Sequence, residues 1–286
     1  MKQFEKDGHR IFLGDALSIL ENSIEDNSID LLFVDPPYNI GKVFGENKEK
    51  WNSDEEYLEW CYKWIDLCIN KLKPNGSIYL MGATQFMPYI DIYLSKKMNI
   101  LSRIMWHYDS SGVQAKKYYG SLYEPIFFAV KSKKDYTFNY KDIMVEAKTG
   151  AKRKLIDYRG AEPKPYNTKK IPGNVWYYPR VRYRMSEYEE HPSQKPEALL
   201  ERIILASSNP GDIVLDPFSG TFTTSAVAKR LNRKSIGIEY EETYFKTGLR
   251  RLDIKSSYNG EQLTAIKKTT AIKNKRNEEK VKVENE

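Results

Sequence analysis

Short apolar runs closed by turn residues alternate with amphipathic stretches along most of the chain. Residues 9–17 (HRIFLGDAL) and 29–38 (IDLLFVDPPY) are such runs, and they are typical of short buried strands. A capping box at 53–56 (SDEE) then predicts the start of a helix. One side of that helix is apolar and carries Tyr57, Trp60, Cys61, Trp64, Ile65, Cys68 and Leu72.

The same alternation continues, is interrupted once, and then resumes. Residues 76–82, 100–109 and 124–131 are expected to be strands, and 87–98 a helix. After an irregular polar block, Lys195-Pro196-Glu197 is expected to open a helix. Residues 211–231 then predict a strand, a turn and a helix, and 234–240 a last strand. The pattern predicts a doubly wound α/β sheet with one insert.

Composition narrows the class of protein. No run of 18 apolar residues is present among the 286, and the first residues lack the apolar core of a signal peptide, so we expect a cytoplasmic protein that does not span a membrane. Cys61 and Cys68 lie about two helical turns apart, too far for a disulfide, and are interpreted as core thiols. The three histidines share no ligand spacing with them, so no metal site is predicted.

The positive charge is concentrated in one block. Residues 131–190 hold 15 Lys and Arg against 8 Asp and Glu, a surplus equal to the net charge of +7 for the whole chain. Ten aromatic residues are interleaved with these cations. A basic surface that can also stack bases suits a nucleic acid, with Arg180, Arg182 and Arg184 expected among the phosphate contacts. A solvated loop over packed aromatics is the alternative interpretation.

Two loops that follow strands carry candidate chemistry. In one, the turn Asp216-Pro217-Phe218-Ser219-Gly220-Thr221 stands between a strand and a helix, and Glu239 ends another strand 23 residues later. An acid at that offset suits the hydroxyls of an adenosine ribose, although many strand-to-helix turns contain Gly and Asp. The absence of a full G-x-G-x-x-G sequence argues against a dinucleotide.

The other loop is Asp35-Pro36-Pro37-Tyr38, directly after an apolar strand. It could be a rigid surface turn, because proline fixes its own φ and restricts the residue before it. Rigidity also suits a reactive site. The Asp35 carboxylate and the Pro36 carbonyl would offer two acceptors, and Tyr38 a flat ring, to a planar base that bears an exocyclic amine.

These motifs carry a family resemblance. The order DPPYN, HPSQKPEALL and DPFSGTFTT resembles the β-group of amino-DNA methyltransferases, in which the catalytic motif precedes the cofactor motif. The resemblance covers about residues 10–254. The stretches DSSGVQAKKYYGSLYEP, VEAKTG and PGNVW are further similar to its YhdJ-like, adenine-specific branch. It implies a mixed, mostly parallel sheet of the class I S-adenosylmethionine-dependent methyltransferase type, in permuted order.

The resemblance also implies roles for residues. Asp35, Pro36, Pro37 and Tyr38 match the catalytic loop. Phe222 stands where the family usually has a second glycine, which leaves a backbone contact near the methionine end of the cofactor in question. The residues matched to S-adenosyl-L-methionine binding are Asp15, Ala16, Asp35, Ser193, Lys195, Asp216, Phe218, Ser219, Gly220, Thr221, Glu239 and Tyr240.

The resulting hypothesis is a site-specific DNA methyltransferase that flips adenine out of double-stranded DNA and methylates its N6 amine. N4 methylation of cytosine is the enzymatic alternative. A nicotinamide-dependent oxidoreductase and a catalytically silent DNA-binding protein are the alternatives from other classes. A homodimer and a cognate restriction enzyme are left open as partners. The expected parts are a catalytic half (1–130), a basic target-recognition insert (131–190), a cofactor half (191–255) and a disordered tail (256–286).

Overall fold

One nine-stranded sheet forms the centre of the computed structural model, which describes residues 1–41, 43–44, 47–48, 51–109, 116–148 and 154–265. Its strand order is β1-β2-β15-β14-β3-β6-β8-β7-β13. Five neighbouring pairs are parallel and three are antiparallel. The predicted mixed, mostly parallel sheet is therefore confirmed. Its strands are β1 (Lys2–Lys6), β2 (His9–Leu13), β3 (Ile29–Val34), β6 (Leu72–Met81), β7 (Asn99–His107), β8 (Tyr123–Val130), β13 (Val175–Tyr177), β14 (Ile213–Asp216) and β15 (Lys234–Glu239).

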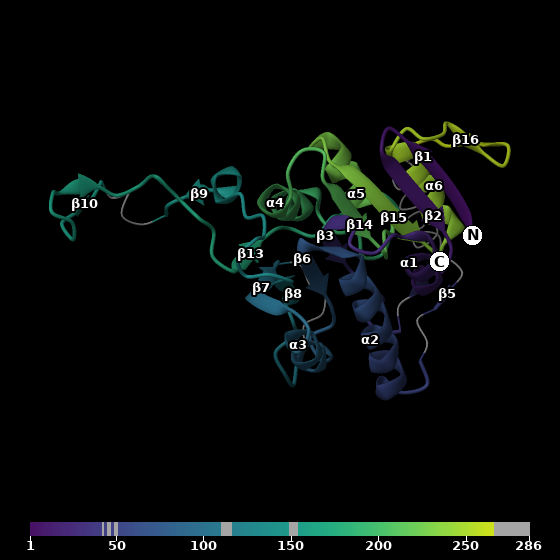
Figure 1. Cartoon of the computed structure of the whole chain (residues 1–286), viewed down its shortest axis with the longest axis horizontal. Helices are drawn as coiled ribbons and strands as arrows, with labels where there is room; N and C mark the ends of the chain where they lie inside the picture. The colour runs from purple at the N-terminus through teal and green to yellow at the C-terminus, as the bar shows by residue number, and fades with distance from the viewer. Residues whose placement is uncertain (42, 45–46, 49–50, 110–115, 149–153, 266–286) are drawn as a thin grey trace, which may run out of the picture.

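Helices cover both faces of the sheet (Figure 1). Helices α1 to α3 pack on one face and α4 and α5 on the other. Both faces are apolar, because successive residues of the central strands point to opposite faces. Leu32 contributes to the first core, and its neighbours Leu31 and Phe33 contribute to the second. The helices are α1 (Ala16–Ser23), α2 (Asp54–Lys71), α3 (Met87–Ser95), α4 (Glu197–Ser207), α5 (Thr223–Arg230), α6 (Glu242–Arg251) and the short 3-10 helix η1 (Tyr140–Ile143).

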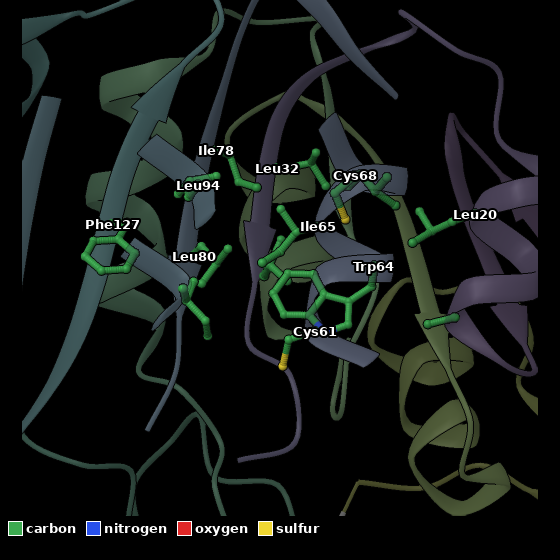
Figure 2. Close-up of a cluster of buried hydrophobic side chains, with 14 of the residues drawn as sticks. Leu20, Leu32, Cys61, Trp64, Ile65, Cys68, Ile78, Leu80, Leu94 and Phe127 are labelled. Atoms are coloured by element: carbon green, nitrogen blue, oxygen red, sulfur yellow. The ribbon is translucent and has the colours of Figure 1, made fainter. Parts of the chain in front are cut away.

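Helix α2 follows its sequence signals closely. Ser53 caps its first turn, since the Ser53 hydroxyl accepts the Glu56 N–H at 3.2 Å. Its apolar side, including Cys61, Trp64 and Cys68, faces β3 and β6 (Figure 2). Both cysteines are buried free thiols, as expected for core residues. Helix α2 therefore packs on the face of the sheet next to β3, and it also contacts the loop that follows β3.

Part of the basic block extends away from the sheet (Figure 1). In this arm β9 (Val145–Glu146) pairs with β12 (Lys169–Lys170), and β10 (Ile156–Asp157) pairs with β11 (Lys164–Pro165). The block is not a separate insert throughout, however. Strand β13 returns from it and joins the edge of the main sheet beside β7, with Trp176 buried. Strand β13 has only three residues and lies between Pro172-Gly173 and Pro179, so it is too short to be recognised from a pattern of apolar positions.

The segment after Ser256 begins with ordered structure. Strands β16 (Ser257–Tyr258) and β17 (Glu261–Gln262) form a hairpin, and Tyr258 is buried against Phe4 and Phe245. The disorder predicted from residue 256 is therefore wrong up to residue 265, because one aromatic side chain anchors an otherwise polar stretch. Residues 266–286 lie outside the described residues.

Two further features concern the rest of the described chain. A short hairpin joins β4 (Val43–Phe44) to β5 (Asn47–Lys48) in the connection between the sheet and α2. Among the described residues, no helix combines the length and the apolar character that crossing a bilayer requires.

Candidate active site

Four neighbouring parallel strands end at one edge of the sheet, and each has a predicted site residue at or just after its end. In sheet order these strands are β2, β15, β14 and β3. They place Asp15, Glu239, Asp216 and Asp35 around one cavity of about 560 Å³. The cavity wall includes every residue that was matched to the catalytic loop or to the cofactor: Asp15, Ala16, Asp35, Pro36, Pro37, Tyr38, Ser193, Lys195, Asp216, Phe218, Ser219, Gly220, Thr221, Glu239 and Tyr240.

The loop after β3 is held from two sides. Behind it, the Tyr57 hydroxyl of α2 donates to the Pro37 carbonyl at 2.8 Å. In front, the Tyr38 hydroxyl donates to Asp35 Oδ1 at 2.7 Å, and Tyr38 is 8% exposed. The loop is therefore fixed by the core, with its carboxylate on the cavity wall.

Lys195 forms a close ion pair with Asp35. Its Nζ lies 2.5 Å from Asp35 Oδ2 and 5.5 Å from the centre of the Tyr38 ring. Sequence matching assigned Lys195 to the cofactor, and in the structure its ammonium contacts the carboxylate that is predicted to be catalytic. Burial alone would lower the pKa of Lys195, yet the Asp35 and Glu124 carboxylates raise it overall. The pKa of Asp35 is raised, because burial and Glu124 together outweigh Lys195.

Glu124 is a site residue that sequence reasoning missed. It lies near the start of β8, which runs antiparallel to β6, so that its side chain reaches the edge where β3 ends. Glu124 Oε2 accepts the Tyr38 hydroxyl at 3.1 Å and lies 3.6 Å from Lys195 Nζ. The signal available in the sequence was an acid at the beginning of an apolar strand, next to a proline.

Two further acids on the cavity wall, Asp216 and Glu239, have raised pKa values. Burial raises the pKa of Asp216 to about 7, although Asp216 accepts the Thr224 hydroxyl at 2.6 Å and the Phe218 N–H at 3.0 Å. Burial likewise raises the pKa of Glu239 to about 8. The Glu239 carboxylate accepts the Gly220 N–H at 2.7 Å, which ties the end of β15 to the turn after β14.

The remaining predicted cofactor residues differ in exposure. The exposed Asp15 caps α1, since its Oδ2 accepts the Ser18 N–H at 2.8 Å, while Ala16 is buried behind it. Tyr240 is 62% exposed at the mouth of the cavity. Phe218 packs its ring on the Trp60 ring at a centroid distance of 5.6 Å, which makes one wall aromatic.

Phe222 has an explanation in the packing. Its backbone is left-handed, with φ of 57°, so the chain keeps there the conformation that a glycine adopts at no cost. Its ring is fully buried between Gly237 and Gly248, where a Cβ atom would lie 2.6 Å and 2.4 Å from it. The side chain therefore lies in the core instead of on the cavity wall, and the cavity is not narrowed by it.

A second, smaller cavity of about 160 Å³ lies on the other side of Tyr38. Tyr108, Glu124 and Arg180 line it together with Tyr38. Arg180 Nη2 lies 3.3 Å from Glu124 Oε1, and the Arg180 guanidinium lies over the Tyr108 ring at 4.4 Å. In this structure Arg180 pairs with Glu124 while its side chain stays 41% exposed, and its expected contact with a DNA phosphate stays a prediction. Within the described residues, no group of three or more His, Cys, Asp or Glu could hold a metal ion.

Comparison with known proteins gives consistent results. A family described as "DNA methylase" matches residues 29–250. The chain is 58% identical to DNA adenine methyltransferase YhdJ of Escherichia coli (strain K12), covering 93% of this chain and 90% of that protein. It is 39% identical to Type II methyltransferase M.HpaI of Haemophilus parainfluenzae, covering 88% and 76%. The solved complex of M1.HpyAVI with SAM superposes with a TM-score of 0.58 at 27% identity, covering 85% of this chain and 98% of that one.

Proposed function

The chain belongs to the DNA methylase family and is an S-adenosylmethionine-dependent DNA adenine methyltransferase, and on this premise we propose which of its residues hold the cofactor and the target base. The observation that carries the proposal is the shared cavity wall, on which Asp35 of the catalytic loop faces the same space as Asp216 and Glu239. One ligand in this cavity would contact all three acids. The oxidoreductase and the silent DNA-binding protein are not supported by this family.

The residues present fit S-adenosylmethionine. A cavity of about 560 Å³ lies within the range of about 300 to 1,000 Å³ that is usual for small-molecule sites. Glu239, buried at the end of β15, would accept the ribose hydroxyls, and Phe218 would pack against the adenine ring. When bound, the cofactor supplies an activated methyl group on a sulfonium. Asp216 would lie nearer the methionine part, since it borders Asp35 across β14 and β3.

The catalytic loop acts on the exocyclic amine. The lone pair of this amine is delocalised into the adenine ring, so two acceptors that bind its N–H groups would localise the lone pair toward the methyl group. Asp35 and the Pro36 carbonyl would be those acceptors, and alignment would supply most of the rate. Tyr38 would stack on the base. After transfer the methylated amine is acidic, and Asp35 or water would take its proton.

DNA would approach the mouth of the smaller cavity. In duplex DNA the target amine is paired, so the base has to leave the helix to reach Tyr38, at a cost of a few kcal/mol. The connection from β7 to β8 borders this cavity through Ser121 and Tyr123. Nearby in the same connection, Tyr118 and Tyr119 are 72% and 103% exposed, beside two lysines. Exposed aromatics beside cations suit contact with unstacked bases and phosphates.

Other partners remain predictions. DNA is the substrate of the family, whereas a second copy of the chain and a restriction enzyme stay expectations from the sequence. We include the protruding arm, of which residues 145–148 and 154–170 are described, among the parts that read the DNA sequence, because it is basic and lies outside the core. The cytoplasmic location likewise stays a prediction.

The decisive experiment identifies the product. Purified enzyme, S-adenosylmethionine and unmethylated genomic DNA should yield N6-methyladenine when the DNA is digested to nucleosides and analysed by mass. Asp35→Ala should lower turnover at least ~10²-fold while cofactor affinity stays near normal. Recovery of N4-methylcytosine alone would overturn the base assignment, and full activity of Asp35→Ala would overturn the role of the carboxylate.

A further inference from the structure

Both carboxylate oxygens of Asp35 are already engaged by side chains of the protein. Oδ1 accepts the Tyr38 hydroxyl at 2.7 Å, and Oδ2 pairs with the Lys195 ammonium at 2.5 Å. The side chain of Asp35 is 15% exposed, so water offers little competition for these positions. An incoming amine that donates a hydrogen bond to Asp35 therefore meets a carboxylate with two strong donors in place.

Glu124 is placed to take over both donors. The Tyr38 hydroxyl has one proton and two carboxylate acceptors, Asp35 at 2.7 Å and Glu124 at 3.1 Å. Lys195 has the same two neighbours, at 2.5 Å and 3.6 Å. Rotation of one hydroxyl would move its hydrogen bond from Asp35 to Glu124 without leaving a buried donor unsatisfied.

Glu124 is itself held in position from its other side. Its Oε1 lies 3.3 Å from Arg180 Nη2 and 3.4 Å from the Tyr108 hydroxyl, which donates to it. The Glu124 side chain is 13% exposed. Glu124 thus lies between Lys195 and Arg180 and is contacted from both sides.

We propose that Glu124 is a positioning residue for methyl transfer, which accepts the Tyr38 hydroxyl when Asp35 turns its oxygen to the target amine. The inference rests on the proposed function of Asp35. Without Glu124 the hydroxyl would stay on Asp35, and the amine would have to displace it. Glu124 lines the smaller cavity and not the larger one in which Glu239 and Phe218 are proposed to hold the cofactor, so cofactor binding would not change.

The test compares Glu124→Gln with the parent enzyme in single-turnover methylation of unmethylated genomic DNA, at saturating enzyme and labelled S-adenosylmethionine. Glu124→Gln should slow methyl transfer by about 10- to 100-fold, the scale of one charge-assisted hydrogen bond. The dissociation constant of S-adenosylmethionine should stay the same. Glu124→Asp keeps the charge and should recover part of the rate.

A double-mutant cycle then separates positioning from mere structure. Tyr38→Phe removes the shared hydroxyl, so in that background Glu124→Gln should cost less than about 3-fold. An equal cost in both backgrounds, or a full rate for Glu124→Gln alone, would overturn the proposal. Glu201→Gln is the matched control, because Glu201 on α4 pairs with Arg230 on α5 and does not border either cavity.

The activity of the parent enzyme distinguishes failure of the proposed function from failure of the role proposed for Glu124. Absence of methyl transfer by the parent would refute the proposed function, whereas transfer by the parent with an unaffected Glu124→Gln refutes only the role of Glu124. The thermal midpoint of each variant is measured alongside the rate. A slow Glu124→Gln enzyme with an unchanged midpoint and unchanged cofactor binding would support positioning over loss of fold.

Discussion

At the scale of the residue, Glu239 links cofactor binding to pH. Burial raises its pKa to about 8, so the carboxyl is mostly protonated at pH 6 to 7 in the free protein. Ribose hydroxyls donate to the ionised form, and binding therefore releases a proton. Affinity for S-adenosylmethionine should rise with pH up to about 8, by as much as about tenfold per unit, and then level off. Isothermal titration calorimetry at pH 6 to 9 measures this slope.

Glu239→Gln supplies the control for that pH dependence. Ionisation of S-adenosylmethionine is the same in both experiments. A difference between the two proteins in how affinity changes with pH is therefore due to Glu239. The variant should bind more weakly above pH 8 and lose the extra slope below it. Parallel curves for the two proteins would show that Glu239 is already ionised throughout this range.

Gly248 makes a second residue-scale prediction. In an exposed helix Gly→Ala adds about 1 kcal/mol of stability, but a Cβ at Gly248 would lie 2.4 Å from the buried Phe222 ring. The ring is fully enclosed and cannot move aside. Gly248→Ala should therefore lower the free energy of unfolding by about 1 to 3 kcal/mol in urea titration.

Gly173→Ala is the matched control, because nothing lies within 4 Å of its added Cβ. It should change the unfolding free energy by less than about 0.5 kcal/mol. Were Gly248→Ala to stabilise the protein instead, the ring of Phe222 would have to sit elsewhere.

Some residues of the site could be predicted from the sequence around them, and others only from the folded structure. Asp35 directly follows an apolar strand, and Asp216 and Glu239 each end one. Because these strands are parallel, the three acids lie at one edge of the sheet, and the sequence pattern was enough to find them. Glu124 comes 86 residues after Tyr38 and reaches it only through the antiparallel pairing of β8. Its role follows from distances, which the sequence alone does not contain.

At the level of the element, the three arginines of residues 180–184, which follow β13, differ in their surroundings. Arg180 is paired with Glu124 in the smaller cavity, whereas Arg182 and Arg184 are exposed. Replacing Arg182 and Arg184 with Ala should reduce the slope of log affinity against log salt by about 2, since two counterions fewer are released. Fluorescence anisotropy with a random-sequence duplex at several salt concentrations measures it.

Arg180→Ala serves as the comparison within the same segment. It should leave the salt slope nearly unchanged and slow methyl transfer, because it removes a support of Glu124. Equal salt effects from Arg180→Ala and from the Arg182 and Arg184 pair would place all three on the phosphates.

For the whole molecule, alternation of apolar strands and amphipathic helices was enough to predict an α/β sheet with helices on both faces. The elements that this pattern did not predict lie at the edge of the sheet. Strand β1 is mostly exposed on both faces and so has no apolar alternation, and α6 was hidden because its stretch is strongly charged. Edge elements are held by a few contacts to the finished core, and these contacts depend on tertiary structure.

The hairpin after Ser256 is one of these edge elements, and truncation tests its contribution. Tyr258 is 5% exposed, packs against Phe4 and Phe245, and its hydroxyl accepts a hydrogen bond from Lys2 at 2.5 Å. Ending the chain after Ser256 would expose these rings, and we expect a loss of about 3 kcal/mol or more, on the scale of truncating a large buried aromatic. Thermal unfolding measures it.

A chain that ends after Ala265 keeps the hairpin and should match the full-length protein in thermal midpoint and in methyl transfer. Tyr258→Ala in the full chain should reproduce most of the loss seen on truncation after Ser256, because the ring is the buried part of the hairpin. If truncation after Ser256 left the midpoint unchanged, the packing of Tyr258 would contribute nothing to stability. If the Ala265 truncation lowered methyl transfer while its thermal midpoint stayed unchanged, residues beyond 265 would take part in binding DNA.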